Sequence, residues 1–140
     1  MRLSEEQYLL FKKAIKEKIN LLGDIKRKYH NKKVQYNGIT FDSEKEYYRY
    51  LWLKVLEEEG KISMLELQKK FLLQEGFTNK TGKKQRPIYY IVDFFYYDKK
   101  LKCYIAEDVK SEITRIDKVY RLKKKMFEYQ YPNIAFKEVI

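Results

Sequence analysis

The sequence predicts an α/β (α+β) fold, in which helices flank a small mixed β-sheet within one domain. Three observations carry this prediction. Segments with an apolar residue at every third or fourth position, which are typical of helices, alternate with short runs rich in β-branched and aromatic residues, which are typical of strands. A chain of 140 residues suits a single domain. Its apolar content of 44% can supply one core.

The charge of the chain indicates a polyanionic partner. The formal net charge is +11, and a cationic protein gains affinity for nucleic acid because each neutralised phosphate releases counterions. The single cysteine rules out a disulfide within the chain, and one histidine with one cysteine excludes a structural zinc site. No apolar run approaches the ~20 residues of a membrane span, and the acidic, amphipathic N-terminus is no signal peptide. We therefore expect a cytoplasmic protein without a membrane partner.

A first helix is predicted over residues 4–22. Ser4 and Gln7 have the spacing of a capping box, and one apolar stripe follows it. The stripe consists of Tyr8, Phe11, Ile15, Ile19 and Leu22. The next segment, "DIKRKYHNKK", is either a solvated linker or an arm that contacts phosphates, and its charge favours contact. Its candidate DNA-binding residues are Lys26, Arg27, Lys28, Lys32 and Lys33.

A hairpin and a second helix are predicted next. Asn37-Gly38 suits a type I′ turn between two short strands. Ser43 begins a helix that extends to about Glu59, and Gly60 ends it. The predicted apolar face of this helix consists of Tyr48, Leu51, Trp52 and Val55.

From Ile62 the apolar residues follow the pattern of strands. Residues 62–74 predict a strand that bends near Lys69-Lys70, and residues 75–87 predict a turn-rich basic loop. Candidate DNA contacts in that loop are Lys83, Lys84 and Arg86. Two apolar strands, "IYYIVDFFYY" and "KCYIAEDVK", follow, and "DKKL" joins them as a tight hairpin.

The last predicted elements are a basic helix over residues 114–129 and a strand, "NIAFKEVI". Pro132 ends the helix. Its predicted apolar face consists of Val119, Leu122, Met126 and Tyr129. Its charged residues are either a solvated face or phosphate contacts, and the candidates for contact are Arg121, Lys123 and Lys124.

The pattern (D/E)-x-K occurs four times, as often as the abundance of acids and lysines explains by chance. The matches are Asp24/Lys26, Glu59/Lys61, Asp98/Lys100 and Asp108/Lys110. The first three lie at helix ends, in linkers or in turns. Only the pair Asp108/Lys110 closes an apolar strand, so this pair is the candidate for a functional site.

The geometry of strands relates this pair to one further acid. Side chains two positions apart share a face, so Asp108 and Lys110 point the same way. Asp93 lies inside the preceding apolar strand, where a charge is costly unless it is paired or bound to a metal. If the hairpin loop has an even number of residues, such as two, Asp93 falls opposite Ala106 and shares the face of Asp108. An odd loop would place Asp93 on the face of Glu107 instead.

Two carboxylates on adjacent strands form an oxygen-rich site for a hard cation such as Mg²⁺. A lysine beside them is a point charge for a phosphate oxygen or an attacking hydroxide. This set suits metal-assisted hydrolysis of a phosphodiester, in which the metal activates water and offsets the charge that develops at phosphorus. The alternative is a structural Asp–Lys pair at the end of a strand.

These residues resemble the signature of the PD-(D/E)XK nuclease superfamily. That signature is an acid at the end of one strand and (D/E)-x-K on the next, often with a glutamate from an upstream helix. Asp93 matches the first acid, with Val92 where the name-giving proline stands, and "DVK" at residues 108–110 matches the second part. The segment "FDSEKE" resembles the F-x-S-x-x-E opening of several branches, which points to Glu46.

Longer segments are similar to small phage-encoded proteins of this superfamily. They are "KYHNKKV" (28–34), "GITFDS" (38–43), "LELQ" (65–68), "VDF" (92–94), "EDVKS" (107–111) and "YRLKKK" (120–125). The similarity spans residues 28–140 and leaves out residues 1–27, the first helix and the basic linker. Ser111 stands where those proteins have a glycine.

The resemblance implies a restriction-endonuclease-like mixed sheet flanked by helices, and DNA cleavage that depends on Mg²⁺ or Mn²⁺. It implies that Asp93, Asp108 and the backbone carbonyl of Val109 bind the metal. It also implies that Lys110 positions or activates the attacking water.

Two further residues belong to the implied site. The resemblance makes Glu46 a catalytic acid and a further metal ligand or a neighbour of one, although Ser43-x-x-Glu46 is equally a capping box. Gln68, on the first long strand, is a candidate ligand or a neighbour of the ligands.

The predicted function is that of a metal-dependent DNA endonuclease in phage replication or recombination, located in the cytoplasm of the host cell. Branched DNA, including the Holliday junction, is the preferred substrate by family analogy. Resolving a junction requires two sites, so we expect a homodimer. The alternatives are a non-catalytic basic DNA-binding module and a restriction-type or transposase-type subunit that needs a partner. A pure binder gains nothing from acids next to phosphates, so the acid pair favours the enzyme.

Overall fold

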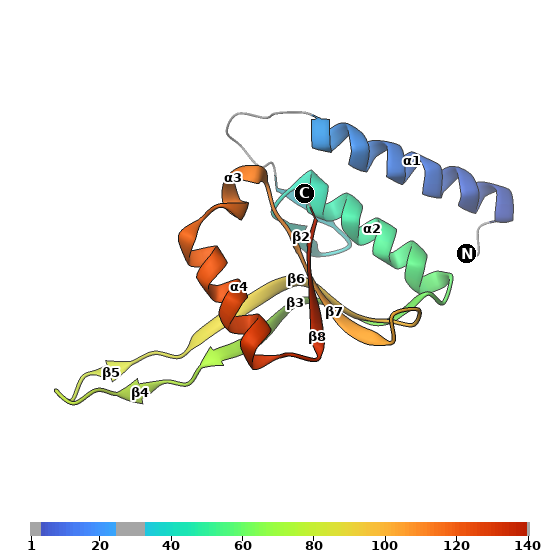
Figure 1. The fold of residues 1–140 in the computed structure, drawn as a ribbon. Coiled ribbons are helices and arrows are strands. Elements are labelled where there is room, and N and C mark those ends of the chain that lie inside the picture. Colours follow the sequence, from blue (N-terminus) through green and yellow to red (C-terminus); the bar gives the residue numbers. More distant parts are fainter. Residues whose placement is uncertain (1–3, 25–32, 140) are drawn as a thin grey trace. The chain divides into compact units, whose positions relative to one another are not determined.

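The computed structural model describes residues 4–24 and 33–139, and its ribbon is drawn in Figure 1. The chain forms two compact units, residues 1–62 and residues 63–140. Together the described elements are four helices, a four-stranded mixed sheet and two small two-stranded sheets. The predicted α+β class is confirmed. The assignment of the whole chain to one nuclease domain stays a prediction.

Two helices and a short hairpin make up the described part of the first unit. They are α1 (Glu5–Asp24), β1 (Val34–Tyr36), β2 (Ile39–Phe41) and α2 (Glu44–Glu58). The backbone N–H of Ser4 donates to the Gln7 side chain (3.1 Å), and the Ser4 hydroxyl accepts from the Gln7 N–H (3.2 Å), which is the predicted capping box. Asn37 and Gly38 have φ values of 48° and 76°, as a type I′ turn requires.

Helix α2 begins where the sequence predicts, because the Ser43 hydroxyl accepts a hydrogen bond from the backbone N–H of Glu46 (3.1 Å). It buries Leu53 and Val55 completely or nearly so. The predicted apolar face included Val55 but left out Leu53, and its other three members are only half-buried. The helix is followed by Gly60, whose φ of 74° ends the helical path.

A cluster of charged groups at the C-terminal end of α2 holds the two helices of this unit together. Lys12 Nζ of α1 lies 3.1 Å from Glu59 Oε1, and Lys61 Nζ lies 3.0 Å from Glu59 Oε2. Tyr8 of α1 donates its hydroxyl to the backbone carbonyl of Val55 (3.1 Å). The Tyr8 hydroxyl, followed by the two lysines, lowers the pKa of Glu59 to about 2 from its ordinary 4.5.

We expect Glu59→Gln to destabilise the protein above pH 4.5 and to have little effect near pH 2. A carboxylate whose pKa is lowered by folding stabilises the fold fully above its unfolded pKa, and this contribution is lost as the pH falls through the folded pKa. Thermal melts at a series of pH values should show the difference in Tm between wild type and variant shrinking as acid is added. The exposed neighbour Glu58 gives the control Glu58→Gln, and an equal, pH-independent loss in both variants would contradict the role of Glu59.

The second unit is built on one four-stranded sheet. Its elements are β3 (Ile62–Gln74), β4 (Phe77–Thr78), β5 (Lys84–Gln85), β6 (Ile88–Asp98), β7 (Cys103–Val109), α3 (Glu112–Arg115), α4 (Lys118–Gln130) and β8 (Ile134–Val139). The strand order in the sheet is β3-β6-β7-β8, and β4 with β5 forms a separate ribbon. Strands β6 and β7 are antiparallel, whereas β7 and β8 are parallel and are joined through α3 and α4.

The turn between β6 and β7 decides the register of the candidate site. Asp98 pairs with Cys103, so the turn consists of the four residues 99–102, an even number as the shared face requires. It is two residues longer than the shortest even turn, because the Asp98 carboxylate accepts from the backbone N–H groups of Lys100 and Leu101 (2.9 Å each). The placement of Asp93 opposite Ala106 is therefore wrong, since Phe95 occupies that position.

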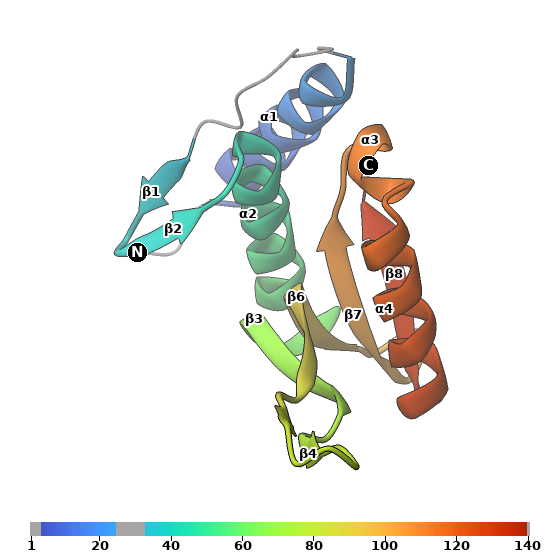
Figure 2. The same cartoon turned by 90° about the vertical axis from the view of Figure 1, so that its left-hand side faces the viewer.

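An aromatic core fills the space between the sheet and α4, which runs alongside β8 in Figure 2. Phe127 of α4 is fully buried at its centre. Its ring centroid lies 5.0–6.0 Å from those of four other rings. They belong to Phe71, Tyr90, Tyr131 and Phe136.

The single helix predicted over residues 114–129 is wrong, because the structure has two helices there. The Asp117 carboxylate accepts from the backbone N–H of Tyr120 (2.8 Å), so a new helix begins at Lys118. Helix α3 has a cap of its own. The hydroxyl of Ser111 accepts from the N–H of Thr114 (3.2 Å), and the Thr114 hydroxyl accepts from the N–H of Ser111 (2.9 Å).

The predicted apolar face of this region is also largely wrong. Val119, Leu122 and Tyr129 are exposed by 62%, 60% and 84%, and only Met126 packs against the core. The buried residues of α4 are instead Tyr120 and Phe127, which are seven positions apart and therefore lie on one face of the helix. Their rings complete the aromatic core. The packing of these rings, and not the predicted apolar stripe, therefore decides which face of α4 is buried.

Candidate functional site

Polar side chains from three adjacent strands meet where the pairing of β6 with β7 ends. The last pair of the ladder is Phe94 with Glu107, and one further step puts Asp93 opposite Asp108. Beyond the ladder the two carboxylates replace backbone acceptors. Asp93 Oδ2 accepts from the backbone N–H of Val109 (2.8 Å), and Asp108 Oδ1 accepts from the backbone N–H of Asp93 (3.3 Å). The two acids are thus interlocked across the strand pair.

The alternation of faces in β6 shifts by one position at this point. Val92 and Phe95 both pack in the core beside α4, although side chains three positions apart in a regular strand point to opposite faces. A local irregularity of the β-bulge kind explains this. It brings Tyr90 and Val92 to the face that Asp93 and Asp108 already share through the register of the strand pair.

Asp108 is 2% exposed, yet donors contact both of its carboxylate oxygens. The Tyr90 hydroxyl donates a hydrogen bond to Oδ2, and Lys110 Nζ lies 3.0 Å from the same oxygen. Burial, and then the negative charge of Asp108, raises the pKa of Tyr90 far above its ordinary value. Tyr90 therefore remains a protonated donor that fixes the orientation of the carboxylate.

Gln68 of β3 is brought to Asp93, and its Nε2 donates to Asp93 Oδ1 (3.3 Å). Gln68 has a φ of 52°, and Met64, four positions earlier, has a φ of 56°. A positive φ in a residue other than glycine costs on the order of 1–3 kcal/mol and is found most often at functional sites. The bend predicted near Lys69-Lys70 thus has its irregularity at Gln68. A part for Gln68 in catalysis stays a prediction.

Lys110 is held from two sides at the end of β7. Its Nζ lies 4.7 Å from the centre of the Tyr120 ring of α4, in a cation–π contact, as well as beside Asp108. Its backbone N–H donates to the carbonyl of Val139 in β8 (2.8 Å). The lysine is 24% exposed, so its charge is placed by the protein and still reaches solvent.

A third carboxylate, Glu138, lies next to this group and was missed by the sequence analysis. The parallel register of β7 and β8 pairs it with Asp108. The Tyr120 hydroxyl donates to its Oε1 (2.6 Å), and Lys124 Nζ lies 3.3 Å from the same atom. Burial raises the pKa of Glu138, but the hydrogen bonds and the charges of Lys124 and Arg115 outweigh burial, so the net effect lowers it.

Glu107 faces away from Asp108, as its strand position predicts. It is fully buried on the opposite face of β7, where the Tyr96 hydroxyl donates to its Oε2 (2.7 Å). The sequence offered no partner for this charge, because a tyrosine two positions away on the neighbouring strand is easily taken for core packing. The two adjacent acids of "AEDVKS" therefore belong to different faces and different environments.

Several other predicted site residues lie in the first unit or outside the described residues. Glu46 belongs to the first unit, where it is 5% exposed in the first turn of α2. Lys33 is exposed just before β1. Four candidates lie outside the described residues, namely Lys26, Arg27, Lys28 and Lys32. The roles of Glu46 and of the Val109 carbonyl stay predictions.

Two basic surfaces lie on the second unit. One is a pocket beside Glu138, lined by the cations Arg115, Arg121, Lys124 and Lys125; the sequence analysis named Arg121 and Lys124 but missed the other two. Lys123 is half-buried on the same helix. The other surface is the β4–β5 ribbon, on which Lys83, Lys84 and Arg86 are all exposed.

The acid pair fits a hard divalent cation. Mg²⁺ is usually held by one or two carboxylates, with water and substrate phosphates completing its shell, and each carboxylate oxygen can accept more than one interaction. Asp93 and Asp108 supply such donors. Within residues 4–24 and 33–139, no three acidic, histidine or cysteine side chains come together as a metal-binding group.

The fold and the cluster define a mixed α+β protein with interlocked acids and a lysine at the end of a strand pair. Residues 26–140 match the model of the family described as "Protein of unknown function (DUF1064)", and the chain belongs to this family. No curated protein and no solved structure matches it significantly. In the part of the chain that the structure describes, every helix is too short or too polar to cross a membrane.

Proposed function

We propose that this protein is a metal-dependent DNA endonuclease with a restriction-endonuclease-like fold. The observation that carries this proposal is the interlocked pair Asp93 and Asp108, with Lys110 Nζ 3.0 Å from Asp108. A structural ion pair needs one acid and one base. A second carboxylate beside that pair adds the oxygen donors that a hard cation such as Mg²⁺ prefers.

Each residue of the cluster has a defined part in the proposed reaction. Asp93 and Asp108 would hold Mg²⁺ or Mn²⁺, which when bound activates water and offsets charge on the phosphate. Lys110, fixed between Asp108 and the Tyr120 ring, places a positive charge where it can orient the attacking water or a phosphate oxygen. Tyr90 and Gln68 hold the two carboxylates in one orientation by donating to them.

The proposed substrate is DNA, and branched DNA such as the Holliday junction is the first choice. The net charge of +11 supports a nucleic-acid partner, and the resemblance to small phage-encoded PD-(D/E)XK nucleases supports a role in phage replication or recombination. A homodimer would supply two sites for the paired cuts of junction resolution. Glu46 and the carbonyl of Val109 are the proposed additional groups around the metal.

We expect Lys110→Ala to lower Mg²⁺-dependent cleavage by about 10²–10⁴-fold, the usual range for a catalytic group that transfers or orients a proton. Cleavage of four-way junction, flap and linear duplex DNA is measured with Mg²⁺, Mn²⁺ or EDTA. DNA binding in EDTA should change by less than about threefold, since one phosphate contact is worth little at moderate salt. Lys99→Ala, an exposed lysine of the β6–β7 turn, is the control that keeps full activity.

The same experiment separates the enzyme from a DNA-binding module. If wild-type protein binds the DNA panel and cleaves none of it with either metal, the chain is a binding module and the acid pair has a structural role. If Lys110→Ala and Lys99→Ala cleave at the same rate as wild type, Lys110 has no part in the chemistry.

A further inference from the structure

The β4–β5 ribbon, defined as residues 75–87, projects beyond the four-stranded sheet (Figure 1). Its strands pair Phe77 with Gln85 and Thr78 with Lys84. The sequence predicted a loop here, whereas the structure has a paired ribbon. It therefore presents its side chains in fixed directions.

The tip of the ribbon is closed by the side chain of Asn79. Its Oδ1 accepts from the backbone N–H and the hydroxyl of Thr81 (3.1 and 2.8 Å) and from the backbone N–H of Lys83 (2.9 Å). The backbone N–H of Asn79 donates in return to the carbonyl of Lys83 (2.9 Å). Gly82, with a φ of 83°, provides the left-handed position that the turn needs.

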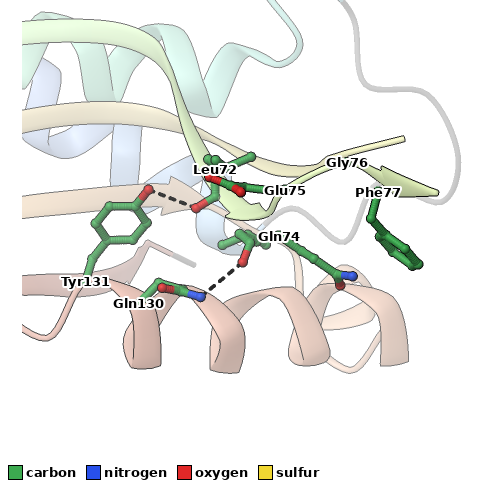
Figure 3. A pocket seen from close by; sticks show the side chains of 8 residues that line it. Leu72, Gln74, Glu75, Gly76, Phe77, Gln130 and Tyr131 are labelled. Carbon is green, nitrogen blue, oxygen red and sulfur yellow. Dashed lines mark hydrogen bonds between the residues drawn. The ribbon is translucent and has the colours of Figure 1, made fainter. Parts of the chain in front are cut away.

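The base of the ribbon is tied to the C-terminal end of α4, around the small pocket drawn in Figure 3. The Tyr131 hydroxyl donates to the carbonyl of Leu72 (2.8 Å), and Gln130 Nε2 donates to the carbonyl of Leu73 (3.2 Å). The end of β3 from which the ribbon continues is thus held by α4, and the tip of the ribbon is ordered by hydrogen bonds within its own turn. This order reduces the conformational entropy that the ribbon loses when it binds a partner, which favours affinity.

The charges of the ribbon are suited to phosphates on two sides. It carries Lys80, Lys83, Lys84 and Arg86, all exposed, against the single acid Glu75. Only Lys84 lies in β5 itself, but because side chains alternate along an extended chain we expect Arg86 to share its face of the ribbon and Lys83 to lie on the other face. A flat anionic surface would use only one of these faces, whereas a groove has a phosphate backbone on each wall.

The width of the ribbon selects between the two grooves of B-form DNA. Its two paired strands lie about 4.8 Å apart along the hydrogen bonds, and side chains extend beyond this width. The major groove is about 12 Å wide and admits a two-stranded ribbon, whereas the minor groove is only about 6 Å wide. The deep, narrow major groove of an RNA duplex would also exclude it.

We propose that the β4–β5 ribbon enters the major groove of B-form DNA tip first, with Lys83, Lys84 and Arg86 contacting the phosphates of its walls. One part of this inference rests on the proposed function, namely the distance along the DNA between the ribbon's contact and the cleaved phosphate. Arg86 precedes Asp93 by seven positions, or about 23 Å of extended chain. This length is the greatest distance that the chain allows between the two residues, so the ribbon contacts duplex DNA within about seven base pairs of the phosphate at the acid cluster.

The test compares two triple variants of the full chain that remove equal charge. K83A/K84A/R86A removes the ribbon cations, and K99A/K100A/K102A removes exposed lysines from the turn at the other end of β6. Affinity for a duplex of about 30 base pairs is measured in EDTA at several salt concentrations. We expect the ribbon variant to lose at least about tenfold in affinity and to lower the salt slope by about 2.7, since each contact contributes about 0.9. The control should change affinity by less than about threefold.

A second measurement uses wild-type protein and probes the groove directly. Methylation of guanine N7, which lies in the major groove, should weaken binding when it is placed within about seven base pairs of the cut. The proposal is overturned if both triple variants lose affinity equally, if N7 methylation anywhere in the duplex has no effect, or if an RNA duplex binds as tightly as DNA.

This test is independent of the proposed nuclease activity. With Mg²⁺ the ribbon variant should need about tenfold more DNA than wild type to reach half of its maximal cleavage rate, whereas Lys110→Ala should bind DNA without cleaving it. If no form of the protein cleaves DNA but the ribbon variant alone loses binding, the ribbon inference holds and the nuclease proposal fails.

Discussion

Asp108→Asn should lower Mg²⁺-dependent DNA cleavage at least about 10³-fold, while the protein stays folded. The change keeps the shape of the side chain and removes the charge that we propose binds the metal. A bound metal supplies several kcal/mol of charge stabilisation in the transition state, and about 4 kcal/mol corresponds to 10³ in rate. Single-turnover cleavage of the best DNA substrate, with Mg²⁺ and with Mn²⁺, measures the effect.

The neighbouring residue offers a matched control for this experiment. Glu107→Gln removes one carboxylate charge at the adjacent position of the same strand, and the Gln carbonyl can still accept from the Tyr96 hydroxyl that now bonds to Glu107. This variant should keep cleavage within a few-fold of wild type, because Glu107 lies on the opposite face. If Asp108→Asn cleaved normally, or if Glu107→Gln lost as much activity while folded, the assignment of the site to the face of Asp108 would be wrong.

Phe127→Ala should lower the free energy of unfolding by about 3–5 kcal/mol, the cost of removing a buried aromatic side chain and leaving a cavity. Phe127 is fully buried and its ring packs against four others. The free energy of unfolding of a typical domain is only about 5–15 kcal/mol, so the variant is expected to be marginally stable. Tyr90, which orients Asp108, belongs to the same core, so cleavage should fall with stability.

Denaturant unfolding gives the difference in free energy, and the same helix supplies the control. Tyr129, two positions from Phe127, is 84% exposed, and Tyr129→Ala should change stability by less than about 0.5 kcal/mol. Similar losses of stability in both variants would mean that Tyr129 is packed in the core, as the predicted apolar face had it. That result would contradict the orientation of α4 in the structure.

The face of the sheet on which the site residues lie could be predicted from the sequence. Asp108 and Lys110 share a face by their spacing alone, and an even turn is enough to add Asp93. The structure has such a turn, but with four residues. The register therefore differs by two positions from the simplest case while the face stays the same. Turn length depends on local hydrogen bonds such as those of Asp98, which a strand pattern does not reveal.

The partners of the acids could not be predicted in the same way. Tyr90 and Tyr96 both lie in an apolar strand, and nothing in their spacing shows that each donates to a different carboxylate. Glu138 reaches Asp108 only through the parallel pairing of β7 with β8, a contact made across a long crossover. The buried face of α4 was predicted wrongly because the apolar stripe that ends at Tyr129 was chosen. The stripe that contains Tyr120 and Phe127 was left out.

The pairing of β7 on its two sides has a consequence for the order in which the site assembles during folding. The antiparallel hairpin β6–β7 closes a short loop, whereas the parallel pair β7–β8 requires the whole α3–α4 crossover to be in place. Short-range contacts form faster because they cost less chain entropy. We therefore expect Asp93 and Asp108 to meet early, and Lys110, whose backbone is fixed by Val139, to reach its place late. In this order the two acids lie side by side before the backbone of Lys110 is fixed against β8.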